Sequence, residues 1–214
     1  MLARWSHGLH VAAGGLLCFT AAAAAGPPSA VLAGAGSADA QRLLEWIKRT
    51  GDHRGGPFAV VDKRNARILV YDGAGVLAGQ SPALLGATRG DHTLAGVGRR
   101  TQTGDIGPDE RTTPAGRFDA VPGLNLGGEP IVWVDYTSAF AIHRVRPGAA
   151  EAPRRRRLAS ASPHDNRASS GCVVVPVRFY EQVVQRVLGK YRSVVYVLPE
   201  TRRPGEFMTA LEQQ

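Results

Sequence analysis

The pattern of hydrophobic and polar positions predicts one short helix followed by a mainly β domain. Residues 38–50 place Leu43, Leu44 and Ile47 on one side of a helix that Gly51 would end. From Phe58 onward the period changes, and short runs rich in valine and isoleucine alternate with polar turns, as strands do. The predicted strands are 58–62, 68–71, 131–135, 140–143 and 193–198, and the runs 76–77 and 83–86 together suggest one more strand after 71.

A second helix and two long polar segments complete the pattern. Residues 176–188 predict a helix, with Pro176 in its first turn and Gly189 at its end. Residues 90–114 and 147–167 are polar and are predicted to be loops, the second of which carries four consecutive arginines at 154–157. Because the strands do not alternate with helices, this order favours a mainly β fold over a doubly wound parallel sheet.

The first 25 residues have the pattern of a secretory signal peptide. Arg4 is the only formal charge before an apolar run of about 15 residues, which ends in the alanines 21–25. This run is shorter than the roughly 20 apolar residues that span a membrane. We therefore expect cleavage, export to the periplasm or cell envelope, and no stable membrane anchor afterwards. The rest divides into a linker with a short amphipathic helix (26–56), a main domain (57–200) and a polar tail (201–214).

Composition and charge narrow the class of partner. The 214 residues are 43% hydrophobic, which is enough for one sizeable core, and carry a formal net charge of +8. A basic surface favours anionic partners such as nucleic acid, membrane headgroups or acidic wall polymers. Nucleic acid is disfavoured because we expect export and find no basic helix or zinc-ligand spacing. No His-Glu-x-x-His or Cys-x-x-Cys motif is present, so we expect no metal.

Cys172 is the most informative single residue. Removal of the leader takes Cys18 with it, so Cys172 becomes the sole cysteine and cannot form an internal disulfide. It follows Gly171, which allows close backbone approach and leaves amide N–H groups for an oxyanion. The helix predicted from Pro176 would lower the pKa of the thiol. A small buried cysteine without chemical function fits the same spacing equally well.

A nucleophilic cysteine needs a base, and two histidines upstream are candidates. His143 ends an apolar strand, whose rigid backbone suits a base that must keep one geometry. His164 lies in a polar turn of the second long loop, where solvent exposure is the simpler explanation. We therefore prefer His143 as the base and keep His164 in reserve, as a residue that could contact substrate.

Four segments, in the same order, resemble the L,D-transpeptidase catalytic domain. They are FAVVD at 58–62, TTPAGRF at 112–118, Ile142-His143 and SSGCV at 169–173. The family has a valine-rich strand ending in aspartate, a Thr-Pro-x-Gly-x-Phe segment, a histidine at a strand end and a Ser/Thr-His-Gly-Cys signature. The resemblance covers about residues 57–199. It implies a β-sandwich or open barrel of the L,D-transpeptidase type with a few short helices.

This resemblance implies a cysteine acyltransferase that acts on the stem peptides of peptidoglycan. Cys172 would be the acylated nucleophile and His143 the general base. Gly171 and Cys172 would offer backbone N–H groups to the oxyanion, and Ser169 and Ser170 would line the substrate pocket. The thiolate would attack an L,D-peptide bond and expel D-alanine, and an amine or water would then release the acyl-enzyme. No cofactor is implied.

The chain departs from the family signature at two positions. Ser170 stands where the family has histidine, and Val174 stands where an arginine commonly follows. Arg178, one helical turn further, is a candidate to supply that charge to the substrate. The segment between His143 and Cys172 is longer than usual for the family, and its arginine-rich loop would cover or extend the cleft.

Two alternatives to transpeptidation remain open from the sequence. The same acyl-enzyme resolved by water would make the protein an L,D-carboxypeptidase or another hydrolase. A catalytically silent module that binds the cell wall would keep the fold and the basic surface. Peptidoglycan is the expected partner in each case, while the acyl acceptor and the oligomeric state stay open.

Overall fold

The computed structural model describes Met1 and residues 36–213; the predicted signal peptide and the first part of the predicted linker (2–35) lie outside the described residues. The helices are α1 (Ala38–Thr50), α2 (Val97–Thr103), α3 (Glu151–Leu158), α4 (Val177–Phe179), α5 (Gln185–Val187) and α6 (Pro204–Glu212). The strands are β1 (Phe58–Asp62), β2 (Arg67–Tyr71), β3 (Leu77–Pro82), β4 (Leu85–Gly86), β5 (Gly116–Leu124), β6 (Pro130–Asp135), β7 (Phe140–Arg144), β8 (Arg167–Ser169), β9 (Val173–Val175) and β10 (Ser193–Val197).

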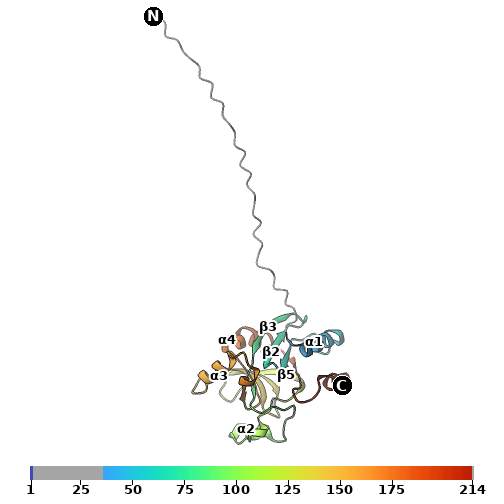
Figure 1. Cartoon of the computed structure of the whole chain (residues 1–214), viewed down its shortest axis with the longest axis vertical. Coiled ribbons are helices and arrows are strands. Elements are labelled where there is room, and N and C mark those ends of the chain that lie inside the picture. The colour runs from blue at the N-terminus through green and yellow to red at the C-terminus, as the bar shows by residue number, and fades with distance from the viewer. Residues whose placement is uncertain (2–35, 214) are drawn as a thin grey trace. The chain divides into compact units, whose positions relative to one another are not determined.

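An eight-stranded sheet in the order β3-β2-β1-β10-β5-β6-β7-β9 forms the body of the domain. Strands β2, β3 and β5 of this sheet are labelled in Figure 1. Most neighbours are antiparallel, but β1 pairs with β10, and β7 with β9, in parallel. Leu84, just after β3, exchanges two backbone hydrogen bonds of 2.7 and 2.9 Å with Val174 of β9. The two edges of the sheet are thereby linked, which makes it a nearly closed barrel. The expected mainly β fold with a few short helices is confirmed.

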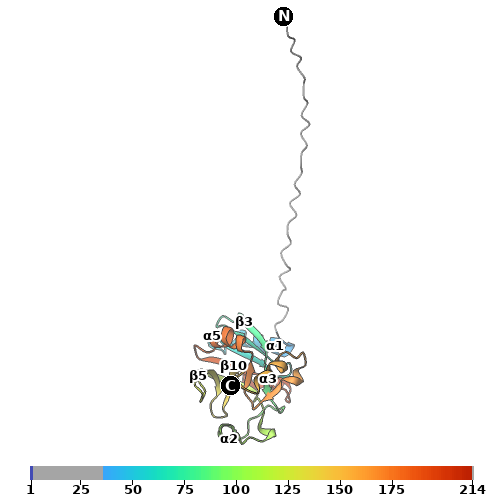
Figure 2. The same ribbon diagram turned by 90° about the vertical axis from the view of Figure 1, so that its left-hand side faces the viewer.

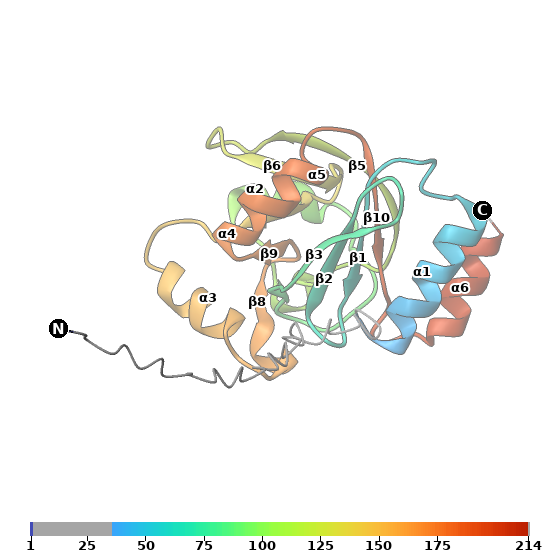
Figure 3. The ribbon, with the colours of Figure 1, turned by 90° about the horizontal axis from the view of Figure 1, so that it is seen from above.

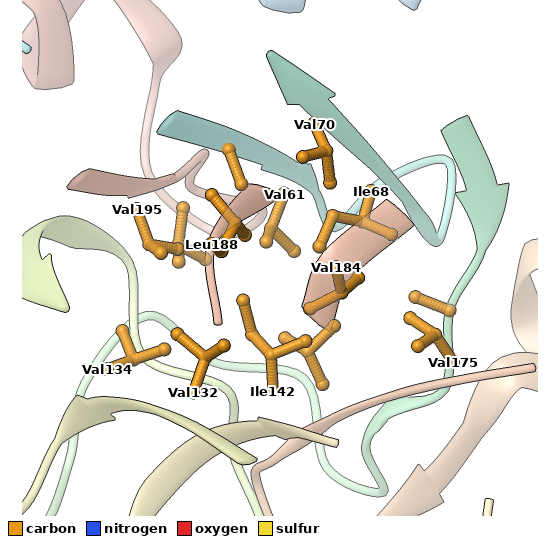
Figure 4. Packing of buried hydrophobic residues seen from close by; sticks show 14 of the residues in the cluster. Val61, Ile68, Val70, Val132, Val134, Ile142, Val175, Val184, Leu188 and Val195 are labelled. Atoms are coloured by element: carbon orange, nitrogen blue, oxygen red, sulfur yellow. The ribbon is translucent and has the colours of Figure 1, made fainter. Parts of the chain in front are cut away.

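Alternation along the strands fills one core inside the curved sheet and a second core outside it. Val61, Val70, Val132 and Ile142 point into the inner core, where Val184 from the segment between α4 and α5 meets them (Figure 4). The opposite faces of β1, β2 and β10 pack against α1 and α6, which lie side by side (Figure 3). Because both of its faces are covered, every residue of β1 is buried.

Two helices agree with the sequence pattern. α1 has the predicted bounds, with the Ser37 hydroxyl accepting the Ala40 N–H at its start and Gly51 in the left-handed conformation at its end. The helix predicted at 176–188 is present as α4, a π-helical turn over Tyr180–Val184, and α5. None of the helices in the described part of the chain has the length and apolar character that a membrane span requires.

The segments predicted as loops contain helices that the sequence pattern did not indicate. α2 lies within 90–114 and projects from one end of the domain (Figure 2). α3 lies within 147–167 and carries the four arginines at 154–157. Leu158 is the only buried residue of α3. With so few buried positions, no apolar stripe at helical spacing marked this helix in advance.

The expected polar tail is also different in the structure. Residues 204–212 form α6, whose Phe207 and Leu211 are buried against Leu43 and Trp46 of α1. These two apolar residues are four positions apart, and they bury one face of an otherwise polar segment. α1 and α6 therefore belong to the same compact unit as residues 57–200.

The packing of α6 predicts that Phe207→Ala lowers the free energy of unfolding by about 3 kcal/mol, because it leaves a cavity between α1 and α6. Urea denaturation followed by circular dichroism measures the change. Thr209→Ala, on the exposed side of the same helix, is the matched control and should change stability by less than about 0.5 kcal/mol. Equal effects of the two substitutions would contradict the packing of α6.

Candidate active site

Strand alternation places the candidate nucleophile and base on one face of the sheet. His143 of β7 lies opposite Val174 of β9, and Cys172 precedes Val174 by two residues. Residues two apart on a strand share a face, so Cys172 and His143 point to the same side. Both line one cleft of about 580 Å³. The intervening Val173 and Ile142 face the other way, into the inner core.

Apolar and basic side chains both line the cleft. The large apolar ones come from β6 and the turns on either side of it, with Trp133 and the exposed Leu126 and Tyr136. The basic ones are Arg146, just after β7, and Arg154 of α3. A second, smaller hollow lined by Thr112, Pro114, Ser138 and Phe140 also borders Cys172, and Ser170 lines both. Cys172 therefore lies where two openings meet.

His143 is held in the protonation state that a general base requires. Its Nδ1 lies 2.7 Å from the carbonyl oxygen of Arg144, which can only accept, so Nδ1 carries the proton and donates it. The neutral ring then keeps an unprotonated Nε2. Burial lowers the pKa of His143 to about 4; the Arg144 hydrogen bond opposes this shift, and the charges of Arg146 and Arg154 add to it. The imidazole is therefore neutral at pH 7.

The Cys172 thiol is protonated at rest. Its Sγ donates to the carbonyl oxygen of Ala139 at 3.5 Å. Burial raises the pKa of Cys172, while a backbone hydrogen bond with Ala141 and the positive charge of Arg146 partly oppose this rise. The expectation that a helix start lowers the pKa of the thiol is wrong, because β9 separates Cys172 from α4, which begins only at Val177.

Gly171 and Ser169 shape the turn that presents Cys172. Gly171 has a φ of +127°, and a Cβ at this position would lie 2.8 Å from the carbonyl oxygen of Thr112, so only glycine fits. The Ser169 hydroxyl accepts the Gly171 N–H at 3.1 Å and donates to the Cys172 carbonyl at 2.6 Å. Ser169 is therefore used inside the turn, and the Gly171 N–H is engaged rather than free for an oxyanion.

Thr113 of the Thr-Pro segment holds this turn in place through hydrogen bonds to buried groups. Thr113 Oγ1 donates to the carbonyl oxygen of Gly171 at 2.7 Å and accepts the N–H of Gly86 at 2.8 Å. The carbonyl oxygen of Thr113 in turn accepts from Lys63 Nζ at 2.7 Å. A chain of hydrogen bonds thus connects Lys63, just after β1, to Gly171, the residue before Cys172.

Lys63 is fully buried within a network of charges. Its Nζ also donates to Asp91 Oδ1 at 2.7 Å and to the carbonyl oxygen of Gly90 at 2.6 Å. Burial alone would raise the pKa of Asp91, but hydrogen bonds from Lys63, Thr201 and the backbone outweigh it and hold that pKa well below its usual range. Glu200, also buried, binds the Arg167 guanidinium of β8. Through Arg167, this network therefore holds β8, the strand that leads to Cys172.

Sequence reasoning missed both members of the Lys63–Asp91 pair. The signal that would have indicated Lys63 is its position just after β1, whose apolar run at 58–61 predicts a strand that passes through the interior. No comparable feature of the sequence predicts that Asp91 is buried, because it lies in a polar turn within a segment predicted as a loop.

Two of the sequence-predicted substrate residues do not lie in the cleft. Arg178 lines a separate groove beside α3, and its Nε donates to Gln182 Oε1 at 3.2 Å. His164 is exposed in the 3-10 turn Pro163–Asn166 and is not among the residues that line the cleft. Arg178 was proposed from a spacing of four residues, but strand β9 covers part of that interval and helical spacing does not apply. The positive charges in the cleft are those of Arg146 and Arg154. The sequence predicted neither as a site residue, although the arginine run 154–157 was expected to cover or extend the cleft.

Among residues 36–213 no three or more His, Cys, Asp or Glu side chains are grouped to hold a metal ion. No protein-family model matches the chain, and no curated protein matches it either. The chemical groups that line the cleft are therefore the basis for assigning a function.

The buried network predicts that Lys63→Met lowers the free energy of unfolding by about 3–5 kcal/mol, because it leaves the buried carboxylate of Asp91 without the ammonium that donates to it. Guanidinium denaturation of the variant and the parent measures the difference. Lys190→Met, at an exposed lysine, is the control and should cost less than about 0.5 kcal/mol. A loss for Lys63→Met no larger than the control's would show that the network does not stabilise the fold.

The raised pKa of Cys172 predicts how its alkylation depends on pH. In a Cys18→Ser background, the rate with iodoacetamide should rise about tenfold per pH unit up to at least pH 8.5, because the reactive thiolate stays a minor species. The same protein in urea, with an ordinary thiol, should level off at lower pH than the folded protein. A folded-state rate that is already constant below pH 7 would mean that the resting thiol is ionised.

Proposed function

We propose that the protein is an exported cysteine acyltransferase, an L,D-transpeptidase that acts on peptidoglycan stem peptides. The observation that carries the proposal is the position of Cys172 and His143 on one face of two neighbouring parallel strands, in one cleft. The four segments that resemble the L,D-transpeptidase domain supply the substrate class. The signal-like pattern of residues 1–25 and the net charge of +8 support export to the periplasm or cell envelope, where acidic wall polymers occur.

Acylation follows from the protonation states at rest. As Cys172 Sγ attacks the carbonyl carbon of an L,D-peptide bond, its proton passes to His143 Nε2. The tetrahedral intermediate then collapses with cleavage of the C–N bond. The protonated His143 gives its proton to the departing amine of D-alanine, and the acyl group stays on Cys172 as a thioester.

Deacylation reverses the roles of the same two groups. An acceptor amine attacks the thioester carbon and gives a proton to His143 Nε2. The C–S bond breaks, and the proton returns to Cys172 Sγ. No electron is gained or lost in either half, so the reaction needs no cofactor.

The environment of the pair favours proton transfer in step with attack. Because the pKa of His143 is about 4, its Nε2 is unprotonated before the reaction, and burial keeps the Cys172 thiol protonated. The ion pair therefore forms only when the substrate supplies a carbonyl carbon for Sγ. For the Gly171 N–H to bind the developing oxyanion, it must exchange its hydrogen bond with Ser169 Oγ for one with substrate.

Hydrolysis of the same acyl-enzyme is the second candidate. It is favoured by the exposure of Ser170, which lines both hollows beside Cys172 and leaves that side of Cys172 next to solvent. A silent wall-binding module would need neither the shared cleft of Cys172 and His143 nor the tautomer that leaves Nε2 unprotonated.

The proposal predicts a covalent adduct with a carbapenem, whose β-lactam carbonyl mimics the acyl donor. Intact-mass measurement should show one carbapenem on the protein and none on Cys172→Ala. His143→Gln should slow the adduct by roughly 10²- to 10⁴-fold, because it removes the general base. His164→Gln, at the exposed histidine outside the cleft, is the matched control and should react at the parental rate.

Thermal unfolding of each variant checks that the folded protein is being compared. Absence of an adduct on folded, reduced protein would contradict the acyltransferase assignment and favour a wall-binding module. Equal labelling of Cys172→Ala would place the reactive group elsewhere.

A further inference from the structure

We propose that Arg146 and Arg154 form a carboxylate-binding site that selects stem peptides by a free carboxylate close to the bond that Cys172 attacks. This inference rests on the proposed function, since it takes the wall stem peptide as the ligand. It concerns two residues outside the segments on which the family resemblance is based.

Both guanidinium groups belong to the cleft that contains Cys172 and His143. Glu129 is the only acidic residue among those that line it, and Arg144 Nη2 and Asn125 Nδ2 already donate to its two carboxylate oxygens at 2.7 and 3.0 Å. Arg146 Nε lies 3.4 Å from the same carboxylate, as its second and more distant cation. The lining of the cleft therefore has more positive than negative charge.

Arg154 has the stronger capacity to bind an added anion. Among the described side chains, its guanidinium forms no ion pair and no side-chain hydrogen bond. Its neighbours differ: Arg155 pairs with Glu151, and Arg157 donates to the carbonyl oxygen of Asp165 at 2.9 Å. A guanidinium presents a planar set of donors that matches the two oxygens of a carboxylate.

The helix that carries Arg154 is fixed to the catalytic strand. Leu158 of α3 is buried against Val145 and against Val174, which follows Cys172 by two residues. Arg154 is one helical turn before Leu158 and turns toward the cleft, whereas Arg155 lines the separate groove. The charge of Arg146 acts on both Cys172 and His143, and that of Arg154 acts on His143, so a bound anion would lie near the reacting groups.

The apolar side chains of the cleft favour an anion attached to an apolar body. Trp133, Leu126 and Tyr136 line the same cleft as the two arginines and suit the aliphatic part of a peptide. A stem peptide offers such a carboxylate at two places: on the terminal D-alanine of the donor, and on the side branch of its diamino acid. The shared chemistry is a peptide carboxylate, and the two sources are separated by experiment.

Binding to full-length Cys172→Ala protein tests the inference without any chemistry. The probe is a synthetic tetrapeptide stem with both carboxylates free, titrated by calorimetry beside two versions that each have one carboxylate converted to a carboxamide. Amidation of the carboxylate that binds Arg154 should raise Kd by roughly 10- to 100-fold. In the Cys172→Ala protein, the additional substitution Arg154→Gln should raise the Kd of the tetrapeptide with both carboxylates free by a similar factor. It should also abolish the difference in Kd between that tetrapeptide and the amidated one.

Arg156→Gln is the matched control, because Arg156 lies in the same arginine run but is exposed and does not line the cleft. It should bind all three probes as the parent does. The inference is overturned if neither amidation weakens binding, or if Arg154→Gln and Arg156→Gln bind alike. Since the binding protein lacks Cys172, this failure is distinct from failure of the carbapenem adduct, which tests the proposed function alone.

Discussion

Lys63 places a positive charge in the interior of the domain, where three oxygen acceptors at 2.6–2.7 Å replace its hydration shell. Removing such an ion from water costs several kcal/mol, so all three acceptors must be held in place. One of them is the carbonyl of Thr113, whose hydroxyl holds Gly171. The requirement to satisfy one buried ammonium therefore sets the position of the turn that carries Cys172.

Strand geometry determines what that turn faces. Because β7 and β9 are parallel neighbours, the alternation that buries Ile142 and Val173 in the core also directs His143 and Cys172 into the cleft. The same burial makes the imidazole and the thiol neutral at rest. Fold stability and the chemistry of the site thus have a common cause in how the strands pair and pack.

The sequence predicted the parts of the fold that depend on local pattern. The apolar runs that become β1, β6, β7 and β10 and the amphipathic stripe of α1 are visible in the order of residues alone. Cys172 and His143 could be predicted as candidates because a glycine before a cysteine and a histidine at a strand end are also local signals.

The features that sequence reasoning missed depend on contacts between distant segments. Lys63 meets acceptors in Gly90, Asp91 and Thr113, and no spacing in the chain reports those contacts. Arg154 lines the cleft because Leu158 packs α3 against β9.

The direct test of the central claim is the intact mass of the protein after rapid mixing with a stem tetrapeptide. The account predicts a Cys172 thioester with the mass of the peptide less D-alanine, and its absence from a protein that a carbapenem does acylate would contradict that claim.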